Sequence, residues 1–108
     1  MGDDIYQLHA EMCKVFSNPI RIKLLNLLRD GKEHSVSELQ KATGLGQANL
    51  SQHLGIMRHK GAVLPKRKGR QILYRISDKK IIVAFDIIRS VLSKNLKSRQ
   101  RMLKNEVL

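Results

Sequence analysis

The stretch that decides the fold is residues 35–76, SVSELQKATGLGQANLSQHLGIMRHKGAVLPKRKGRQILYRI. It opens with two segments of helical periodicity, about 35–43 and 47–60, which only Gly44-Leu45-Gly46 separates. The apolar period then changes, and residues 63–76 read as two short strands around a glycine, the pattern of a tight hairpin. Two helices joined by a short glycine-bearing turn and followed by a hairpin are the sequence pattern of a winged helix-turn-helix.

Local signals support these two helices. Ser35 and Glu38 have the spacing of a capping box, in which the serine hydroxyl accepts a hydrogen bond from an orphan amide and the glutamate reaches back. Gly44 supplies the positive φ that ends the first helix. The residues expected to face the core are Val36, Leu39 and Ala42 in the first helix and Leu50, Leu54 and Met57 in the second.

The rest of the chain adds three helices, expected at about 4–16, 19–30 and 78–104. Asn18 and Pro19 mark the start of the second of them, because asparagine is a good N-cap and proline fits the first helical position. A length of 108 residues with 42% hydrophobic residues suits one domain with a modest core. The expected fold is therefore mainly α with a small β-hairpin, a single winged helix-turn-helix domain with five helices plus a two-stranded wing.

The charge points to a polyanionic partner. Twenty-one Lys and Arg against nine Asp and Glu leave a formal charge of +12. Seven cations and no carboxylate lie from Arg58 to Arg75, and five more cations follow from Lys94 to Lys104. No basic helix carries the aromatic anchors of membrane-surface binding, and no apolar run reaches the ~18–20 residues of a membrane span. We expect a soluble, cytoplasmic protein whose partner is double-stranded DNA rather than a membrane.

Two groups of residues are candidates for contacting DNA. The major groove admits one helix, whose N-terminal half must present short hydrogen-bonding side chains to base edges. The candidate base-contacting residues are Gln47, Asn49, Ser51 and Gln52. Cations on and beside the hairpin would reach phosphates or the minor groove and release counterions; they are Arg58, Lys66, Arg67, Lys68 and Arg70. The alternative is that both groups are ordinary solvated surface.

The last predicted helix carries an apolar seam. Its residues are spaced four, three and four apart, as in two heptads of a coiled coil. So small a monomer has nowhere to bury this seam, so we expect a homodimer. The expected dimer interface comprises Ile81, Phe85, Ile88 and Leu92 of the last helix with Leu8 and Met12 of the first.

Three segments in order resemble the ArsR-type repressors. Residues 16–25, FSNPIRIKLL, are similar to the family's ADPTRLRIL, and residues 50–63 are similar to its VSQHL…LR…GLV recognition helix. Residues 68–76, KGRQILYRI, are similar to its EGRxVYYRL wing. The resemblance covers about residues 5–95. It implies a winged-helix homodimer, built through the first and last helices, that represses an operator until an inducer binds.

The family's known metal sites are not expected here. Members that sense soft metals carry two thiolates in a stretch such as ELCVCDL, whereas residues 33–39 read EHSVSEL. Ser35 and Ser37 occupy the thiolate positions, and a hydroxyl is a poor soft-metal ligand. Zinc-sensing members use His and carboxylates of the last helix, but no His follows His59. We therefore expect no metal and no cofactor, and the inducer stays open.

The single cysteine and the histidines leave minor alternatives. His9 and Cys13 are four residues apart on one helix, a spacing that could place two donors on a metal shared between subunits. Cys13 could also form an intersubunit disulfide as a redox switch, but the main interpretation is a surface His beside a small buried thiol. His53 is expected to flank the buried stripe and serve packing or a phosphate hydrogen bond. His34 and His59 are expected to be exposed.

These observations favour a homodimeric, sequence-specific DNA-binding transcriptional regulator, a repressor, acting on an inverted-repeat operator. An enzyme is not expected, because no Ser-His-Asp set, acid/base carboxylate pair or phosphate-cradling glycine loop can be assembled. The main alternative is a basic architectural or chromatin-like protein that coats DNA with little sequence specificity. An RNA-binding winged helix would need exposed aromatic residues for base stacking, which the sequence does not offer.

Overall fold

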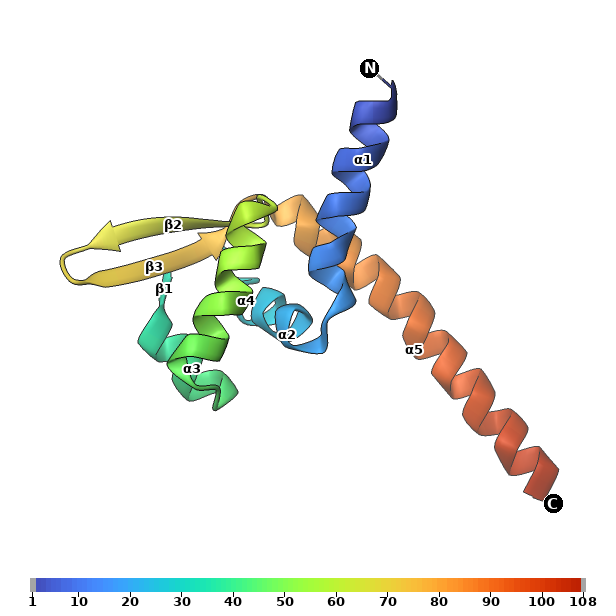
Figure 1. Ribbon diagram of the computed structural model, residues 1–108. Helices are drawn as coiled ribbons and strands as arrows, with labels where there is room; N and C mark the ends of the chain where they lie inside the picture. The colour runs from blue at the N-terminus through green and yellow to red at the C-terminus, as the bar shows by residue number, and fades with distance from the viewer. Residues whose placement is uncertain (1, 108) are drawn as a thin grey trace.

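The computed structural model describes the backbone of residues 2–107 and the side chains of residues 4–102. Five α-helices, one 3-10 turn and three short strands follow one another in this part of the chain (Figure 1). They are α1 (Gly2–Cys13), η1 (Lys14–Ser17), α2 (Pro19–Leu27), β1 (His34–Ser35), α3 (Val36–Thr43), α4 (Gln47–His59), β2 (Val63–Lys68), β3 (Gln71–Ile76) and α5 (Lys79–Val107). This confirms a mainly helical winged helix-turn-helix fold with five helices.

The start of α2 forms as its sequence predicts. The side-chain oxygen of Asn18 accepts hydrogen bonds from the amides of Ile20, at 2.9 Å, and Arg21, at 3.3 Å. Two of the first four amides of α2, which have no partner within the helix, are thereby satisfied. Pro19 fills the first helical position, where its missing N–H costs nothing.

Two predicted helix boundaries are wrong. The first helix is α-helical only to Cys13, and residues 14–17 form a tighter 3-10 turn. The second helix ends at Leu27 rather than residue 30. Gly31 adopts a φ of +74°, and its amide donates to the carbonyl of Leu28 at 3.2 Å. The residues just before Gly31 are therefore used in this turn and cannot extend the helix.

The cap of α3 is half of the predicted capping box. The Ser35 hydroxyl accepts from the Glu38 amide at 3.1 Å, as expected. The Glu38 carboxylate does not reach back to Ser35; it lies 3.1 Å from a ring nitrogen of His34. An imidazole that already faces another carboxylate is a better partner for a glutamate than a single amide, so this contact replaces the second half of the box.

The strands form an antiparallel sheet in the order β1-β3-β2. In the hairpin, Lys68 pairs with Gln71, so Gly69 and Arg70 form a two-residue loop. Gly69 has a φ of +62° and Arg70 has a negative φ, the combination of a type II′ turn. The two-residue strand β1, which pairs with Tyr74 and Leu73 of β3, was not predicted. The sheet at the base of the wing therefore has three strands rather than two.

The core joins α2, α3 and α4 to the base of the sheet. Leu25 of α2 belongs to it, whereas Ala42, predicted to face inward, is exposed. Ile82 and Phe85 of α5 pack against the same core. Its fully buried side chains are Val15, Leu24, Leu25, Leu28, Leu39, Leu50, Leu54, Met57 and Val63.

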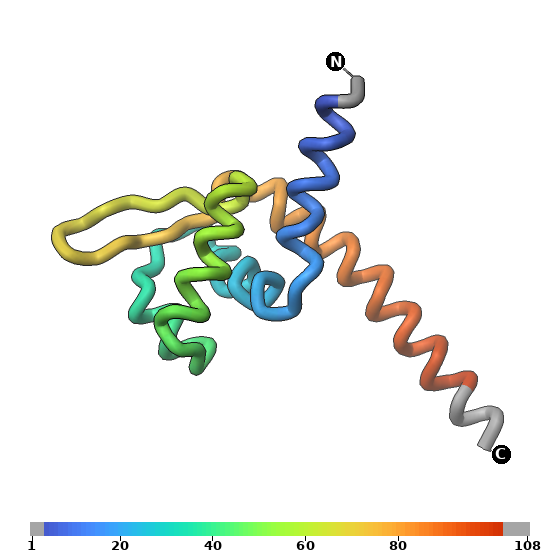
Figure 2. Tube along the Cα trace, in the orientation of Figure 1, coloured from blue at the N-terminus to red at the C-terminus, as the bar shows by residue number. Residues whose placement is uncertain are grey.

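The two terminal helices project from this core. Figures 1 and 2 show the hairpin reaching to one side of the helices while α1 and α5 extend on the other. Within the described residues, no helix is both long and apolar enough to cross a membrane. Large apolar side chains are exposed along both helices, among them Ile5, Leu8, Val83, Ile87, Ile88, Val91, Leu92 and Leu96. The wing and the terminal helices thus present surfaces of different character.

Candidate nucleic-acid interface

Helix α4 separates a buried face from a polar one. Leu50, Leu54 and Met57 are fully buried and anchor the helix on the core. The four predicted base-contacting residues are all exposed: Gln47, Asn49, Ser51 and Gln52. Ala48 and Gly55, also exposed, are too small to obstruct the approach of a groove wall. The arrangement presents short polar side chains on a surface that a DNA major groove can accommodate.

A first cleft lies between α4 and the wing, and we call it the α4–wing cleft. It has a volume of about 270 Å³ and is lined by Arg58, Pro65, Arg67 and Ile72. The structure therefore brings together two cations that are nine residues apart in the sequence. Both are exposed. Two guanidinium groups around one cleft form a strong site for phosphate oxygens.

A second cleft lies between α3, the first turn of α4 and the wing, and we call it the α3–wing cleft. Its volume is about 220 Å³. Gln47 was predicted to contact a base, and Arg70 to contact phosphates or the minor groove. Both residues line this cleft. Three further polar residues line the cleft that were not predicted to contact DNA: Ser37 and Gln71, which are exposed, and Gln40, which is half-buried.

The remaining wing cations are exposed along the hairpin. Lys66 also has a carboxylate nearby: its amino group lies 3.3 Å from the carboxylate of Glu33. Lys68 stands at the end of β2, next to the turn. Because the Lys66 side chain is largely exposed, this ion pair is weak and salt can screen it.

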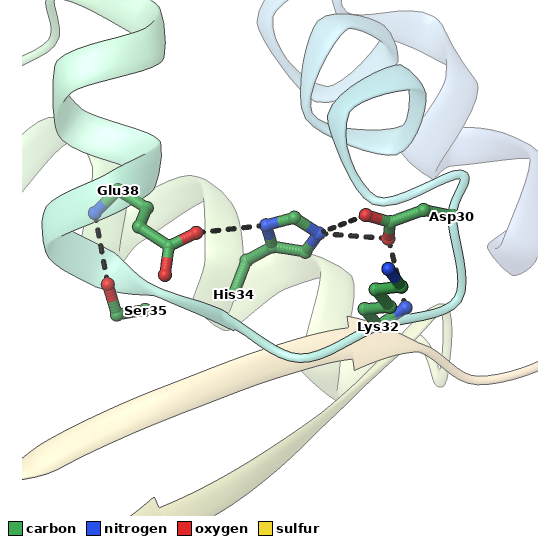
Figure 3. Close-up of polar contacts among 5 residues, drawn as sticks. All are labelled: Asp30, Lys32, His34, Ser35 and Glu38. Atoms are coloured by element: carbon green, nitrogen blue, oxygen red, sulfur yellow. Dashed lines mark hydrogen bonds and ion pairs between the residues drawn. The ribbon is translucent and has the colours of Figure 1, made fainter.

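A histidine holds two carboxylates beside this surface (Figure 3). His34 Nε2 lies 2.9 Å from both carboxylate oxygens of Asp30, and Nδ1 lies 3.1 Å from Glu38 Oε2. A neutral imidazole has one N–H, so only the imidazolium can donate to both carboxylates. The hydrogen bond with Asp30 raises the pKa of His34, and its partial burial acts in the opposite direction. His34 is half-buried, so the prediction that it is exposed is wrong.

The same contacts act on Asp30. Its hydrogen bond with His34 lowers the pKa of Asp30, and the backbone amide of Lys32, at 2.9 Å, adds to this effect. The two ring nitrogens of His34 point to different carboxylates, so the three side chains do not converge on one point. In the described part of the chain, no group of three metal-ligating side chains is placed to hold a metal ion.

Arg21 of α2 connects η1, the turn that follows α1, to α4. Its guanidinium donates to the carbonyls of Lys14, at 3.0 Å, and Val15, at 3.3 Å, and lies 3.4 Å from His53 Nδ1. Since arginine only donates, His53 accepts here as a neutral ring. Desolvation lowers the pKa of His53, and the charge of Arg21 lowers it further. His53 is half-buried beside the apolar stripe of α4, as predicted.

Glu11 makes a second connection between α1 and α4. Its carboxylate accepts hydrogen bonds from Lys60, at the end of α4, and from Lys14, at 2.9 Å. These bonds, first with Lys60 and then with Lys14, lower the pKa of Glu11 to about 2. On the same helix His9 is exposed, and Cys13 is exposed too. The prediction of a buried thiol is therefore wrong: Cys13 lines an apolar cavity that is open to solvent, together with residues of α5.

The predicted dimer seam is divided. Phe85 is only 5% exposed, and the guanidinium of Arg89 lies 4.5 Å from the centre of its ring, so Phe85 serves the core of its own chain. Ile81 and Met12 are partly buried against the same core. The other three predicted residues are open: Ile88 is 53%, Leu92 61% and Leu8 65% exposed. Two apolar cavities, of about 230 and 280 Å³, meet at Phe16 and Ile88 on this side of the molecule.

Comparison with known sequences identifies the family. The bacterial regulatory protein, arsR family, matches residues 18–63. The chain is 36% identical over 105 residues to the HTH-type transcriptional regulator Rv0081 of Mycobacterium tuberculosis, covering 96% of this chain and 91% of that protein. It is 42% identical over 71 residues to the biofilm growth-associated repressor of Xylella fastidiosa, covering 66% of this chain and 61% of the repressor.

Solved structures agree. The crystal structure of Rv0081 matches with a TM-score of 0.78 and 38% identity, over 88% of this chain and 95% of that chain. The homodimeric winged helix-turn-helix DNA-binding domain of Mb0332 from Mycobacterium bovis, a possible ArsR-family regulator, also gives a TM-score of 0.78. It is 26% identical and covers 87% of this chain and 86% of its own. The chain therefore belongs to the ArsR family of bacterial winged helix-turn-helix transcriptional regulators.

Proposed function

We propose that the protein is a homodimeric repressor that binds an inverted-repeat operator in double-stranded DNA and recognises its sequence. The observation that carries this proposal is the exposed polar face of α4 beside a cationic wing. Ser51 and Gln52 would read base edges in the major groove, while Arg58 and Arg67 of the α4–wing cleft would bind phosphates. A surface that combines both kinds of contact suits a sequence reader better than a protein that only coats DNA.

The dimer would form through α1 and α5. Ile88, Leu92 and Leu8 expose apolar surface in a single chain, and the related domain from M. bovis is described as homodimeric. A second copy of the chain would cover this surface and bury apolar area at about 25 cal/mol per Å². Two-fold symmetry then requires an operator with two inverted half-sites.

The proposed repressor does not use the family's known metal sites. Ser35 is buried, only 7% exposed, and its hydroxyl already caps α3; Ser37 offers only another hydroxyl where metal sensors have thiolates. These residues do not fit a soft metal. We therefore expect zinc, cadmium and arsenite to leave operator affinity unchanged within a factor of about three. The inducer would then be something other than these metals. As a DNA-binding regulator of bacterial genes, the protein would act in the cytoplasm.

Selection of binding sites from a pool of random DNA tests the proposal. The expected product is an inverted repeat whose half-sites lie about one helical turn apart, bound by a dimer that resists excess random competitor. A coating protein of low specificity would select no common sequence and would be displaced in proportion to the competitor. That second result would contradict the proposed function and support the architectural alternative.

A further inference from the structure

The path of a DNA strand between two grooves constrains what lies between α4 and the wing. One phosphodiester strand separates a major groove from the adjacent minor groove. If α4 enters the first and the wing reaches the second, this strand must cross the surface between the first turn of α4 and the wing tip. The α3–wing cleft lies there, with Gln47 on one side and Arg70 and Gln71 on the other. Helix α3 adds Ser37 and Gln40.

The lining of the α3–wing cleft suits a phosphate. Carboxamide, hydroxyl and guanidinium groups are the donors that proteins offer to phosphate oxygens. The hydroxyl of Ser35 is already used, because it accepts a hydrogen bond from the Glu38 amide. The five other polar side chains have no hydrogen-bond partner among the residues that the structure describes. Convergent polar groups without a protein partner remain available for a ligand.

The nearest carboxylate of α3 is held away from this cleft. Glu38 is not among its lining residues, because its side chain is turned to His34 Nδ1 at 3.1 Å (Figure 3). His34 holds Asp30 with its other nitrogen. The imidazolium therefore offsets one of the two negative charges and weakens the repulsion of a phosphate next to α3.

We propose that the α3–wing cleft is the seat of one DNA phosphate, on the strand that separates the two grooves, in each half-site. Gln40, Gln71 and Ser37 are its neutral ligands, and Arg70 supplies the charge. Arg70 thereby contacts the strand between the grooves rather than the floor of the minor groove. The inference rests on the proposed function, because it assumes that α4 and the wing occupy adjacent grooves.

Neutral phosphate ligands have a distinctive signature in binding experiments. They contact every sequence alike, yet they release no counterion of their own. We expect Gln40→Ala and Gln71→Ala each to weaken binding about two- to twelvefold, on the selected operator and on random DNA alike, without changing the salt slope. Gln7→Ala, which removes the same side chain from the exposed face of α1, is the matched control and should bind like the wild type.

A chemical change in the DNA locates the phosphate. On the selected operator, single phosphates are replaced one at a time by uncharged methylphosphonates. At one position in each half-site, the replacement should weaken the wild type more than it weakens Gln71→Ala or Gln40→Ala, because those variants have already lost the contact. Thermal unfolding of each variant, followed by circular dichroism, checks that the fold is retained.

Two failures can be told apart. If Gln40→Ala and Gln71→Ala bind both DNAs as tightly as the wild type, the phosphate seat is wrong, while a selected inverted repeat still supports the proposed function. If no sequence is selected, the proposed function fails. Weaker binding of the two variants to random DNA would then still support a phosphate seat in the cleft, and unchanged binding would contradict it. A loss confined to the operator would mean that these glutamines read bases, which also overturns the proposal.

Discussion

The α4–wing side and the α1–α5 side of the molecule differ in how much apolar surface a single chain leaves exposed. Around α4 and the wing, most large apolar residues are buried, and apart from Leu64 and Ile72 of the hairpin the exposed surface is largely polar and cationic. Along α5, Ile87, Ile88, Val91 and Leu92 stay more than half exposed, whereas Ile82 and Phe85, near the start of the helix, are buried in the core. The first surface matches its proposed DNA partner as it stands, whereas the second leaves apolar side chains exposed that the proposed dimer would cover.

This difference separates two kinds of energy. Burial of apolar side chains stabilises an assembly at any salt concentration, while phosphate contacts weaken steeply as salt rises. Changes on the α1–α5 side should therefore alter the oligomeric state first and DNA binding as a consequence. Changes around α4 and the wing should alter DNA binding and leave the dimer intact. Each prediction that follows tests one part of this division, from the largest expected effect to the smallest.

The largest effect is expected from Ile88→Glu. In the proposed dimer this substitution buries an unpaired carboxylate, which costs about 4 kcal/mol or more. Sedimentation should show a dimer for the wild type and a monomer for the variant, with operator affinity lost as a result. Ser93→Glu, on the polar side of α5, is the control and should remain dimeric. A well-folded wild-type monomer at micromolar concentration would rule out this interface.

Gln52→Ala should have the next largest effect, confined to the operator. A glutamine that bonds two atoms of an adenine contributes sequence discrimination, so its loss should cost about 1–3 kcal/mol on the best operator and little on random DNA. Binding isotherms on both DNAs, with sedimentation to show an intact dimer, measure this. Equal losses on both DNAs would remove Gln52 as a base reader.

Arg70→Ala should act on all DNA. The residue lines a cleft assigned to phosphate, so operator and random DNA should lose affinity by similar factors, and the salt slope should fall by about one per subunit. Isotherms at three salt concentrations provide the slope. A loss confined to the operator would mean that the wing reads sequence or groove width, and the division between base and phosphate contacts would then be wrong.

The smallest predicted effect depends on pH. Asp30 raises the pKa of His34, so the folded state favours the imidazolium, and its contribution to stability is fully present below the unfolded pKa of about 6.5. This contribution is lost as pH rises through the higher pKa of the folded state. Because Asp30 and Glu38 are more than a third exposed, we expect less than about 1 kcal/mol.

The measurement is the free energy of unfolding of the wild type and His34→Gln as a function of pH. The wild type should be the more stable protein at pH 6, and its advantage should shrink as the solution becomes alkaline. Operator affinity should fall over the same interval, because two uncompensated carboxylates would then lie beside the phosphate. A difference between the two proteins that does not change with pH would show that His34 is not held as an imidazolium.

The sequence predicted the helix-turn-helix and the hairpin because their signals are local. Gly44 and Gly69 both take the positive φ expected of them, and Asn18 caps α2 as its residue type indicates. The exposed face of α4 followed from the helical period of its apolar residues. The base-contacting and phosphate-contacting assignments themselves remain predictions, since they concern a partner.

What sequence reasoning missed depends on contacts between distant segments. Strand β1 has two residues, too few to show a period, and exists because it pairs with β3 about 40 residues further along the chain. The same pairing brings α3 next to Gln71 and creates the α3–wing cleft. His34 takes the carboxylate of Glu38 from the capping box only because the turn after α2 also places Asp30 beside it. Cys13 was expected to be buried, but it lies at the edge of an open cavity between α1 and α5 and is exposed.

The two contacts that link α4 to α1 and to the turn η1 after it have a mechanical consequence for the proposed dimer. Arg21 holds the carbonyls after α1 and His53 of α4, and Glu11 holds Lys60 at the far end of the same helix. A helix pinned near its middle and at its end cannot swivel independently of the dimer axis. In the proposed dimer the two α4 helices would then keep a fixed separation, which suits half-sites one DNA turn of about 10–10.5 base pairs apart. Inserting a single base pair between the half-sites would put them out of phase by roughly a tenth of a turn, and we expect this insertion to weaken binding by the dimer.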